Sequence, residues 1–292
     1  MLFRSERFRE PPPAADTVAY TQAEYDRLCA PGGLRFALIR LAMKTLGRLS
    51  GGIRLGWRAG FDSGVMLDYV YRNEPHGLFD RQYLNSIGWR GIRQRKVNLA
   101  RVLRDTIRQV HATGQPVRVL DIAAGPGRYV LETMRIMPEI PMQAELRDYK
   151  QENLDAAQRL AEEMKLKNVT VARGDAFDRA SLAGVSPKPT IAIVSGLYEL
   201  FPRNEPVQQS LAGLADAVAP GGYLIYTNQP WHPQMEFIAR VLTNREGQPW
   251  IMRRRTQAEM DGLVRAAGFE KLRQEIDQWG IFTVSVARRV TA

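Results

Sequence analysis

Residues 117–130 read VRVLDIAAGPGRYV, and this stretch predicts the fold of the chain. Its apolar start, residues 117–122, is typical of a buried parallel strand, and a turn of small residues and a helical pattern follow. Gly125 and Gly127 in the turn let a ligand approach the backbone closely, because no Cβ stands in the way. Since ligands of open α/β sheets bind at the carboxyl ends of the strands, the turn predicts a ligand site.

The glycine spacing narrows the kind of ligand. A dinucleotide-binding turn, G-x-G-x-x-G, would have a third glycine where this chain has Val130, and the phosphate-binding pattern G-x-x-x-x-G-K-[ST] is absent. A strand, Asp121 and then A-x-G-x-G resemble motif I of the class I methyltransferases that use S-adenosyl-L-methionine (SAM). The resemblance implies that Asp121 lies by the methionine end of SAM, while Gly125 and Gly127 border its sulfonium and ribose.

Later segments repeat the pattern of a strand followed by an acidic residue. The segment 142–149 leads to Asp148, 21 residues after Gly127, where a carboxylate can accept hydrogen bonds from ribose hydroxyls. A third strand leads to Asp175, and the resemblance implies that Asp175 and the two residues after it hold the adenine. For any one of these aspartates the alternative is that it only caps a helix.

The remaining strands complete a sheet. The segment 190–196 leads to Ser195 at the expected substrate mouth, a Pro-Gly-Gly turn enters the strand 222–228, and EKLRQEIDQ and GIFTVSVARR form an antiparallel hairpin. We expect an α/β fold: a Rossmann-like seven-stranded methyltransferase sheet with a C-terminal antiparallel hairpin, plus an N-terminal helical extension. The residues expected to bind the cofactor are Asp121, Ala123, Gly125, Gly127, Arg128, Asp148, Tyr149, Asp175, Ala176, Phe177 and Ser195.

The composition fits an ordinary globular protein. The chain has 292 residues, enough for one α/β domain and an extension. Its single cysteine, Cys29, excludes a disulfide framework and fits a reducing compartment, and with three histidines and no metal motif we expect no metal site. The start, MLFRSERFREPPP, lacks the apolar core of a signal peptide, and no run of about 18 apolar residues occurs. We therefore expect a cytoplasmic protein.

The positive charge lies mostly in the N-terminal part. Formal net charge is +10, and residues 1–115 hold 19 of the 41 basic but only 10 of the 31 acidic residues. We divide the chain into a basic helical extension or substrate cap, 1–115, and a nearly neutral SAM-binding domain, 116–292. The extension predicts an anionic partner or surface, the alternative being a basic face that is merely solvated.

One helix of the extension is predicted over residues 34–49. Arg40, Lys44 and Arg48 share one face of it, and apolar side chains cover much of the rest. Such a helix lies either in a membrane interface or on the protein core with its charges in water. The glycine pair at 51–52 is expected to end it.

A second long helix is predicted over residues 92–110. Leu99, Leu103 and Ile107 mark its buried face. Its arginines, Arg95 among them, make it basic. They are part of the basic extension, which either meets an anionic partner or is merely solvated.

The segment 61–96 is dense in Tyr, Trp, Arg and Asn, and it lies where this class of enzyme usually places a substrate cap. Together with NQPWHPQMEFIARVL, residues 228–242, it resembles a bacterial methyltransferase group found alone or fused to α/β-hydrolase domains. The resemblance covers roughly residues 45–290. The G-x-S-x-G pattern of the hydrolase half is absent from this chain.

The chemistry implied by the resemblance is displacement of the SAM methyl group by a nucleophile, which leaves S-adenosyl-L-homocysteine (SAH). The sulfonium is already a good leaving group, so the protein mainly positions the reactants. A hydroxyl or protonated amine would also need a base. His232, after the fifth strand, is the first candidate, and Tyr198 and Glu199, after the fourth, are next. His232 also has a purely structural interpretation, and Glu199 an alternative role on the methionine amine or at a helix cap.

Three classes of function stay open for this cofactor. A lipid-like or small amphiphilic methyl acceptor fits the basic amphipathic helix and the hydrolase-fused relatives, and an anionic surface on the inner face of the membrane is the partner that goes with it. RNA is a less favoured acceptor, because SGLYE stands where methyltransferases of base amines often carry N-P-P-[YF]. A basic aromatic extension nevertheless suits nucleic acid. A regulator that binds SAM without transferring methyl groups is the third class.

Overall fold

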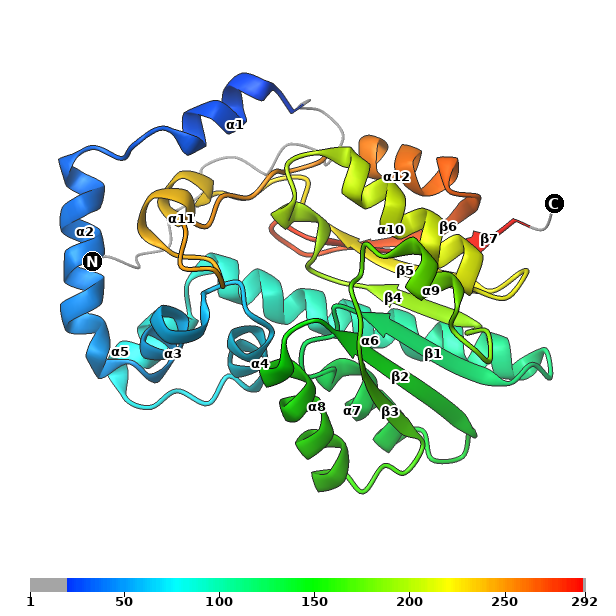
Figure 1. Cartoon of the computed structure of the whole chain (residues 1–292). Helices are drawn as coiled ribbons and strands as arrows, with labels where there is room; N and C mark the ends of the chain where they lie inside the picture. The colour runs from blue at the N-terminus through cyan, green and yellow to red at the C-terminus, as the bar shows by residue number, and fades with distance from the viewer. Residues whose placement is uncertain (1–19, 291–292) are drawn as a thin grey trace.

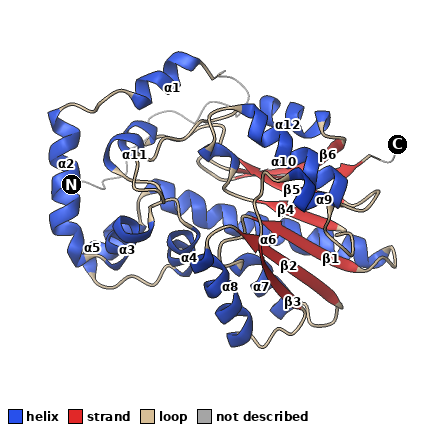
Figure 2. Cartoon of the chain, in the orientation of Figure 1, coloured by secondary structure: helices blue, strands red, loops and turns tan. Residues whose placement is uncertain are grey.

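The computed structural model describes residues 20–290, which form a mixed sheet with helices on both faces (Figures 1 and 2). The seven strands lie in the order β3-β2-β1-β4-β5-β7-β6, and β7 runs antiparallel to both of its neighbours. Two predictions, the proline run and the lack of a signal peptide, concern the first 13 residues. These residues lie outside the described part of the chain. The strands are β1 (Val117–Ile122), β2 (Met142–Asp148), β3 (Val169–Arg173), β4 (Ile191–Val194), β5 (Tyr223–Asn228), β6 (Phe269–Ile276) and β7 (Thr283–Arg289).

This topology confirms the predicted fold class. The five parallel strands and the closing hairpin lie in the predicted segments. β3 is shorter than predicted and ends at Arg173, because the chain then turns where Asp175 Oδ1 accepts a hydrogen bond from the Phe177 N–H at 2.9 Å. Since β1 to β5 are parallel, their carboxyl ends lie along the same edge of the sheet.

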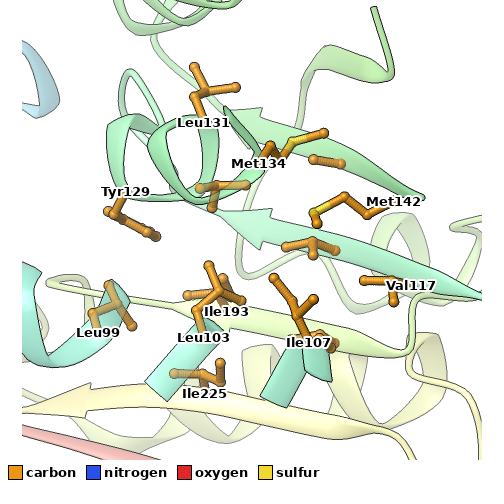
Figure 3. Packing of buried hydrophobic residues seen from close by; sticks show 14 of the residues in the cluster. Leu99, Leu103, Ile107, Val117, Tyr129, Leu131, Met134, Met142, Ile193 and Ile225 are labelled. Carbon is orange, nitrogen blue, oxygen red and sulfur yellow. The ribbon is translucent and has the colours of Figure 1, made fainter. Parts of the chain in front are cut away.

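Alternate residues of each strand face opposite layers of helices. In β4, Ile191 and Ile193 face one hydrophobic cluster, and Ala192 and Val194 face the other. The first cluster is covered by α6, α7 and α8, and the second by α9, α10 and α12. Figure 3 shows side chains of the first cluster, among them Leu103 of α6 and Leu131 of α7. The helices are α1 (Gln22–Cys29), α2 (Leu34–Leu46), α3 (Gly51–Ala59), α4 (Gly64–Arg72), α5 (Leu78–Leu84), α6 (Ile87–Ala112), α7 (Arg128–Ile136), α8 (Gln151–Glu163), α9 (Arg179–Ala183), α10 (Asn204–Ala217), α11 (Met235–Val241) and α12 (Gln257–Ala266).

Helices α1 to α5 and α11 form what we call the helical cap, which lies beside the carboxyl edge of the sheet (Figure 1). Its hydrophobic cluster brings Phe61, Met66 and Val70 together with Trp250 and Ile281 from the far end of the chain. The cap therefore draws side chains from both sides of the boundary predicted at residue 115.

Asp80 holds the cap helices to one another. It is fully buried and accepts hydrogen bonds from Ser50 Oγ at 2.5 Å, from the N–H groups of Gly52 and His76 at 3.0 and 2.9 Å, and from the Tyr69 hydroxyl. Burial alone would raise the pKa of this carboxyl, but the four donors outweigh it, and the pKa lies below its ordinary value. Asp80 is thus an ionised anchor for α3, α4 and α5.

Three predictions for the helices of the extension were wrong. The glycine pair at 51–52 begins a helix instead of ending one, because Ser50 caps α3 by accepting a hydrogen bond from the Ile53 N–H at 3.1 Å. The long helix α6 begins five residues earlier than predicted, at Ile87. Arg95, expected among the basic residues outside the buried face of this helix, is only 2% exposed.

Candidate functional site

The loop after β1 and helix α4 enclose what we call the glycine-loop pocket. Gly125 has a left-handed backbone, with φ 56°, and lies so close to α4 that a Cβ there would stand 3.1 Å from the Gly64 Cα. Ala123 also has a positive φ of 53°, which is uncommon for a residue with a side chain. The pocket is lined by Gly64, Leu67, Asp68, Tyr71, Ala123, Ala124, Gly125, Pro126, Gly127, Arg128, Tyr129 and Ser195.

Five of the predicted cofactor residues, Ala123, Gly125, Gly127, Arg128 and Ser195, meet in this pocket. Arg128 ties the loop to the cap, since its guanidinium forms a two-pronged ion pair with Asp68 of α4 at 2.5 and 3.1 Å. The cap therefore closes directly over the glycine loop.

Two buried polar groups beside this pocket have no hydrogen-bond partner within the described protein. These are both carboxylate oxygens of Asp121, which is fully buried, and the hydroxyl of Ser195. Burial raises the pKa of Asp121 to about 8. The nearby Tyr129 hydroxyl lowers this pKa, although its contact with Asp121 is not a hydrogen bond of standard geometry, and the negative charge of Asp148 raises the pKa further. Because unpaired buried polar groups are costly, a ligand that supplied partners here would be stabilised.

The raised pKa of Asp121 predicts a pH dependence of stability. Between about pH 4 and pH 8 the folded protein keeps a proton on this carboxyl that the unfolded chain releases, so rising pH lowers the free energy of unfolding. Asparagine has no such proton. We expect the free energy of unfolding of Asp121→Asn, taken relative to that of the wild type, to rise by at least about 1 kcal/mol from pH 5 to pH 8. Urea unfolding at both pH values measures this change. A difference that does not change with pH would mean that the folded protein holds Asp121 ionised.

Asp148 is tied to the glycine loop. Its Oδ2 accepts a hydrogen bond from the Gly125 N–H at 2.9 Å, and its Oδ1 accepts from the Lys150 N–H and Asn153 Nδ2 at 2.9 and 3.0 Å. A carboxylate offers about four lone-pair sites, so these three bonds leave about one for a ligand hydroxyl. Asp148 can therefore fix the loop and still accept one hydrogen bond from a ribose.

Tyr149 follows Asp148 at the rim of the site. It is 40% exposed, and its hydroxyl accepts a hydrogen bond from Arg245 Nε at 2.6 Å. Arg245 also pairs with Asp62 of the cap at 2.7 Å. Tyr149 is thus linked to the cap, although it does not line the glycine-loop pocket.

The predicted adenine residues lie one strand further along, after β3. Asp175 is exposed and Ala176 is buried. Phe177 is half-buried and packs edge-on against Phe201, with ring centroids 4.4 Å apart. These residues lie at the carboxyl edge of the sheet, outside the glycine-loop pocket.

A second space, which we call the aromatic cavity, lies between the helical cap and the loops after β4 and β5. Leu67 lines both this cavity and the glycine-loop pocket, and the adjacent residues Ser195 and Gly196 line one each. The two spaces therefore adjoin. The apolar lining consists of Met43, Leu67, Tyr83, Trp89, Ile92, Leu200, Phe237, Ile238, Leu242, Trp250, Met252 and Phe282.

Arg95 is the cationic side chain of the aromatic cavity. Its guanidinium stands over Gly196, where φ is 72° and a Cβ would lie only 2.9 Å from Nη2. Its polar contacts are long: Glu199 Oε1 lies 3.4 Å from Nη1, the Tyr71 hydroxyl lies 3.5 Å from Nη2, and Nε has no partner. The flat guanidinium lies 4.8 Å from the centre of the Phe282 ring. Arg95 is therefore a buried cation with spare donors.

Of the three predicted catalytic residues, Glu199 and His232 line the aromatic cavity and Tyr198 does not. The Tyr198 hydroxyl lies 2.9 Å from Ser210 Oγ on α10, and burial raises its pKa. His232 Nδ1 accepts a hydrogen bond from the Gln234 N–H at 3.1 Å, and burial lowers the pKa of His232 to about 3. A neutral imidazole carries one proton, so we assign it to Nε2, which makes that nitrogen a donor.

The sequence analysis missed the roles of Arg95 and of the arginine run 253–255. Arg95 follows Ile92 by three positions and precedes Leu99 by four, which places it on the buried stripe of α6, so the helical period held the signal. The run 253–255 supports Glu199, because the Arg253 N–H donates to the Glu199 carbonyl at 2.8 Å. No periodic pattern marks this run.

Two features are absent from residues 20–290, the described part of the chain. No group of three or more His, Cys, Asp or Glu side chains gathers in the way that metal binding requires. None of the helices in this range has both the length and the apolar character needed to cross a membrane.

Comparison with known proteins agrees with the fold. A family model described as "Putative methyltransferase" matches residues 2–289, and the chain belongs to this family. The uncharacterized protein YnbC of Escherichia coli strain K12 is 53% identical over 268 residues, which cover 89% of this chain and 46% of that protein. The chain thus spans about half the length of this relative.

Solved structures share the architecture. A possible exported protein from Bordetella parapertussis matches with a TM-score of 0.64 at 21% identity, over 78% of this chain and 80% of that one. Magnesium protoporphyrin IX methyltransferase from Synechocystis, solved with bound SAH, matches with a TM-score of 0.55 at 16% identity, over 79% of this chain and 97% of that one. At these identities the likeness shows the fold alone. By family and fold, the prediction of a class I methyltransferase is confirmed.

Proposed function

We propose that the chain transfers methyl groups from SAM, with the cofactor in the glycine-loop pocket and the methyl acceptor in the aromatic cavity. The contact between the two spaces carries this proposal, since they share Leu67 and adjoin at Ser195 and Gly196. When bound, SAM supplies a methyl group activated by its sulfonium. The protein's task is then to hold both reactants in line and exclude water.

The residues around the glycine loop fit this cofactor. Asp121 and Ser195, buried without partners, suit the charged amino-acid end of SAM, whose ammonium donates hydrogen bonds. Asp148 keeps about one lone-pair site for a ribose hydroxyl. Tyr149 and the segment 175–177 border the adenine side.

The methyl acceptor we propose is a small, largely apolar or lipid-like molecule. The aromatic cavity supports this, because most of its lining is apolar and the rings of Trp89 and Trp250 stack with centroids 6.2 Å apart. RNA would instead favour a groove lined with several cations along its phosphates. The cavity offers one cation, Arg95, among its lining residues.

The test supplies the protein with SAM labelled in its methyl group, together with either a bacterial lipid extract or total RNA. We expect label in an organic-soluble product. Label in RNA would replace the lipid-like acceptor by a nucleic acid. Tight SAH binding with no transfer to either would identify a SAM-binding regulator instead.

His232→Gln tests the first candidate for the base. Because we assign the proton of the neutral His232 to Nε2, glutamine keeps a donor at about the same reach, and we expect turnover to fall by no more than about tenfold. A base role would predict a loss of about 10²–10⁴-fold. Steady-state kinetics with the labelled acceptor distinguish these outcomes, and a loss in the larger range would restore His232 as the base.

We also propose that α2 brings the protein to an anionic membrane surface. Leu34, Leu38 and Leu41 share one helix face and are 76%, 56% and 59% exposed. Arg40 and Lys44, which the sequence placed beside the lipid in the membrane alternative, contact Trp57 of α3 instead. Arg40 Cζ and Lys44 Nζ lie 5.7 and 5.3 Å from the centre of its ring. The exposed leucine stripe is therefore the inserting face of the proposal, and the positive charge of the extension supplies the attraction.

Serine at all three leucine positions of α2 is expected to reduce sedimentation with phosphatidylglycerol vesicles at least about tenfold, because the inserted apolar area is lost. Leu272→Ser is the matched control, since Leu272 is 51% exposed on β6, far from α2 in the chain. Rising salt should weaken the wild-type binding. Equal sedimentation of the triple variant and the wild type would contradict the role of α2.

A further inference from the structure

We infer that the methyl acceptor presents a hydroxyl oxygen between Arg95 and Glu199, so that the reaction is the O-methylation of an apolar alcohol or phenol. This inference rests on the proposed function and specifies the acceptor atom. It depends on the geometry of one buried ion pair in the aromatic cavity.

The buried pair of Arg95 and Glu199 is looser than the well-buried pair of Arg254 and Glu24. Both side chains are buried, yet a single contact of 3.4 Å joins them. By comparison, Arg254 holds Glu24 through two contacts of 2.7 Å each. A buried guanidinium usually meets its carboxylate through short, parallel hydrogen bonds. The spare donors of Arg95, Nε among them, therefore remain available for an oxygen of a ligand.

A hydroxyl matches this pair better than other nucleophiles. It accepts a hydrogen bond from Arg95 and donates one to Glu199, so it satisfies both charges at once. An ammonium group would face the guanidinium and a carboxylate would face Glu199, and like charges are costly at a buried site. A neutral amine also donates and accepts, but its single lone pair cannot both accept a hydrogen bond from Arg95 and attack the methyl carbon, whereas a hydroxyl oxygen has two lone pairs. The pair therefore favours a neutral hydroxyl.

Two further side chains of the cavity suit oxygen atoms of the same molecule. The amide nitrogen of Gln229 contacts the sulfur atoms of Met235 and Met252 at 3.5 and 3.8 Å, which are weak acceptors. His232 Nε2, as assigned above, is a donor. Both side chains can therefore donate a hydrogen bond to an oxygen of a ligand.

In the methyl transfer one bond forms, one bond breaks, and a residue of the aromatic cavity takes the proton. The hydroxyl oxygen forms a bond to the methyl carbon while the carbon–sulfur bond breaks, and the electron pair of that bond stays on sulfur. The hydroxyl proton passes to the Glu199 carboxylate. Arg95 stabilises the negative charge that develops on the oxygen during this transfer.

The first test identifies the bond to the labelled methyl group in the product of the wild-type protein. A methyl ether survives alkaline hydrolysis and does not bind a cation exchanger, and this is the expected result. Methanol released by alkali would show a methyl ester, and retention on the exchanger would show a methylated amine. Either result overturns this inference and leaves the proposed function standing, whereas the absence of any transfer contradicts both.

The second test uses Glu199→Gln, with Glu199→Asp as the conservative variant. We expect Glu199→Gln to lower kcat by about 10²–10⁴-fold while KM and the Kd for SAH stay within about threefold. Glu199→Asp should recover part of the loss, which a purely structural role does not predict. A kcat close to that of the wild type in Glu199→Gln would overturn the assignment.

Arg95→Lys tests which ligand Arg95 binds. The two alternatives are the hydroxyl of the methyl acceptor and the carboxylate of the cofactor. We expect weaker turnover with an unchanged Kd for SAH in calorimetry. A Kd for SAH raised at least about tenfold would assign Arg95 to the cofactor and overturn the inference. Since removing one partner of a buried pair can unfold a protein, each variant is checked by thermal unfolding, and the product analysis uses the wild type alone.

Discussion

Replacing Asp148 by alanine is expected to weaken SAH binding by about 10- to 150-fold, because a charge-assisted hydrogen bond contributes about 1.5–3 kcal/mol. The carboxylate does two things that alanine cannot. It holds the Gly125 N–H at 2.9 Å, which shapes the glycine loop, and it keeps about one lone-pair site for a ribose hydroxyl. Calorimetric titration with SAH measures the change.

Asp155→Ala is the matched control for Asp148→Ala. Asp155 is an exposed aspartate on α8, seven residues further along, and it should bind SAH like the wild type after substitution. Thermal unfolding of both variants shows whether the fold is retained. A folded Asp148→Ala protein with wild-type affinity would remove Asp148 from the cofactor site.

Arg255→Met is expected to cause the largest loss of stability. Arg255 is 1% exposed and donates hydrogen bonds to the carbonyls of Tyr198, Phe201 and Arg203 at 2.6, 2.7 and 3.1 Å, and to Asn204 Oδ1 at 2.9 Å. Burial and the nearby charge of Arg253 lower the pKa of Arg255 to about 10, so it stays charged at neutral pH.

Without Arg255 these four acceptors lose their donor, at up to about 1–3 kcal/mol for the buried Tyr198 carbonyl and less for the three that are part-buried. We expect the free energy of unfolding to fall by about 3–5 kcal/mol and Tm by roughly 6–15 °C. Turnover should fall as well, because Tyr198 and Phe201 flank the turn that carries Glu199. Arg265→Met, at an exposed position of α12, should stay within about 0.5 kcal/mol of the wild type. A Tm shift as small as that of the control would contradict this role of Arg255.

The sheet could be predicted because its signals are local. The apolar run 117–122 and the glycine turn that follows it specify a strand, a turn and a helix within fourteen residues. The hairpin at the C-terminus is equally local, since Asp277 accepts hydrogen bonds from the N–H groups of Trp279, Ile281 and Phe282 in its turn. Family and fold follow from such short segments.

The aromatic cavity could not be predicted, because its walls come from residues as distant in the chain as Met43 and Phe282. Arg95 shows the conflict between two sequence rules. Charged residues are seldom fully buried, which favoured a place outside the buried face of α6, but the helical period that links Ile92 and Leu99 was the better guide. The contact of Arg40 and Lys44 with the Trp57 ring could not be predicted either, because Trp57 lies on another helix, α3.

The most direct test of the central claim, that the glycine-loop pocket binds SAM, is a calorimetric titration of the wild-type protein with SAH and with NAD under the same conditions. The account predicts that SAH binds at least about tenfold more tightly, since the glycine loop lacks the third glycine of a dinucleotide site. Tighter binding of NAD than of SAH would contradict it.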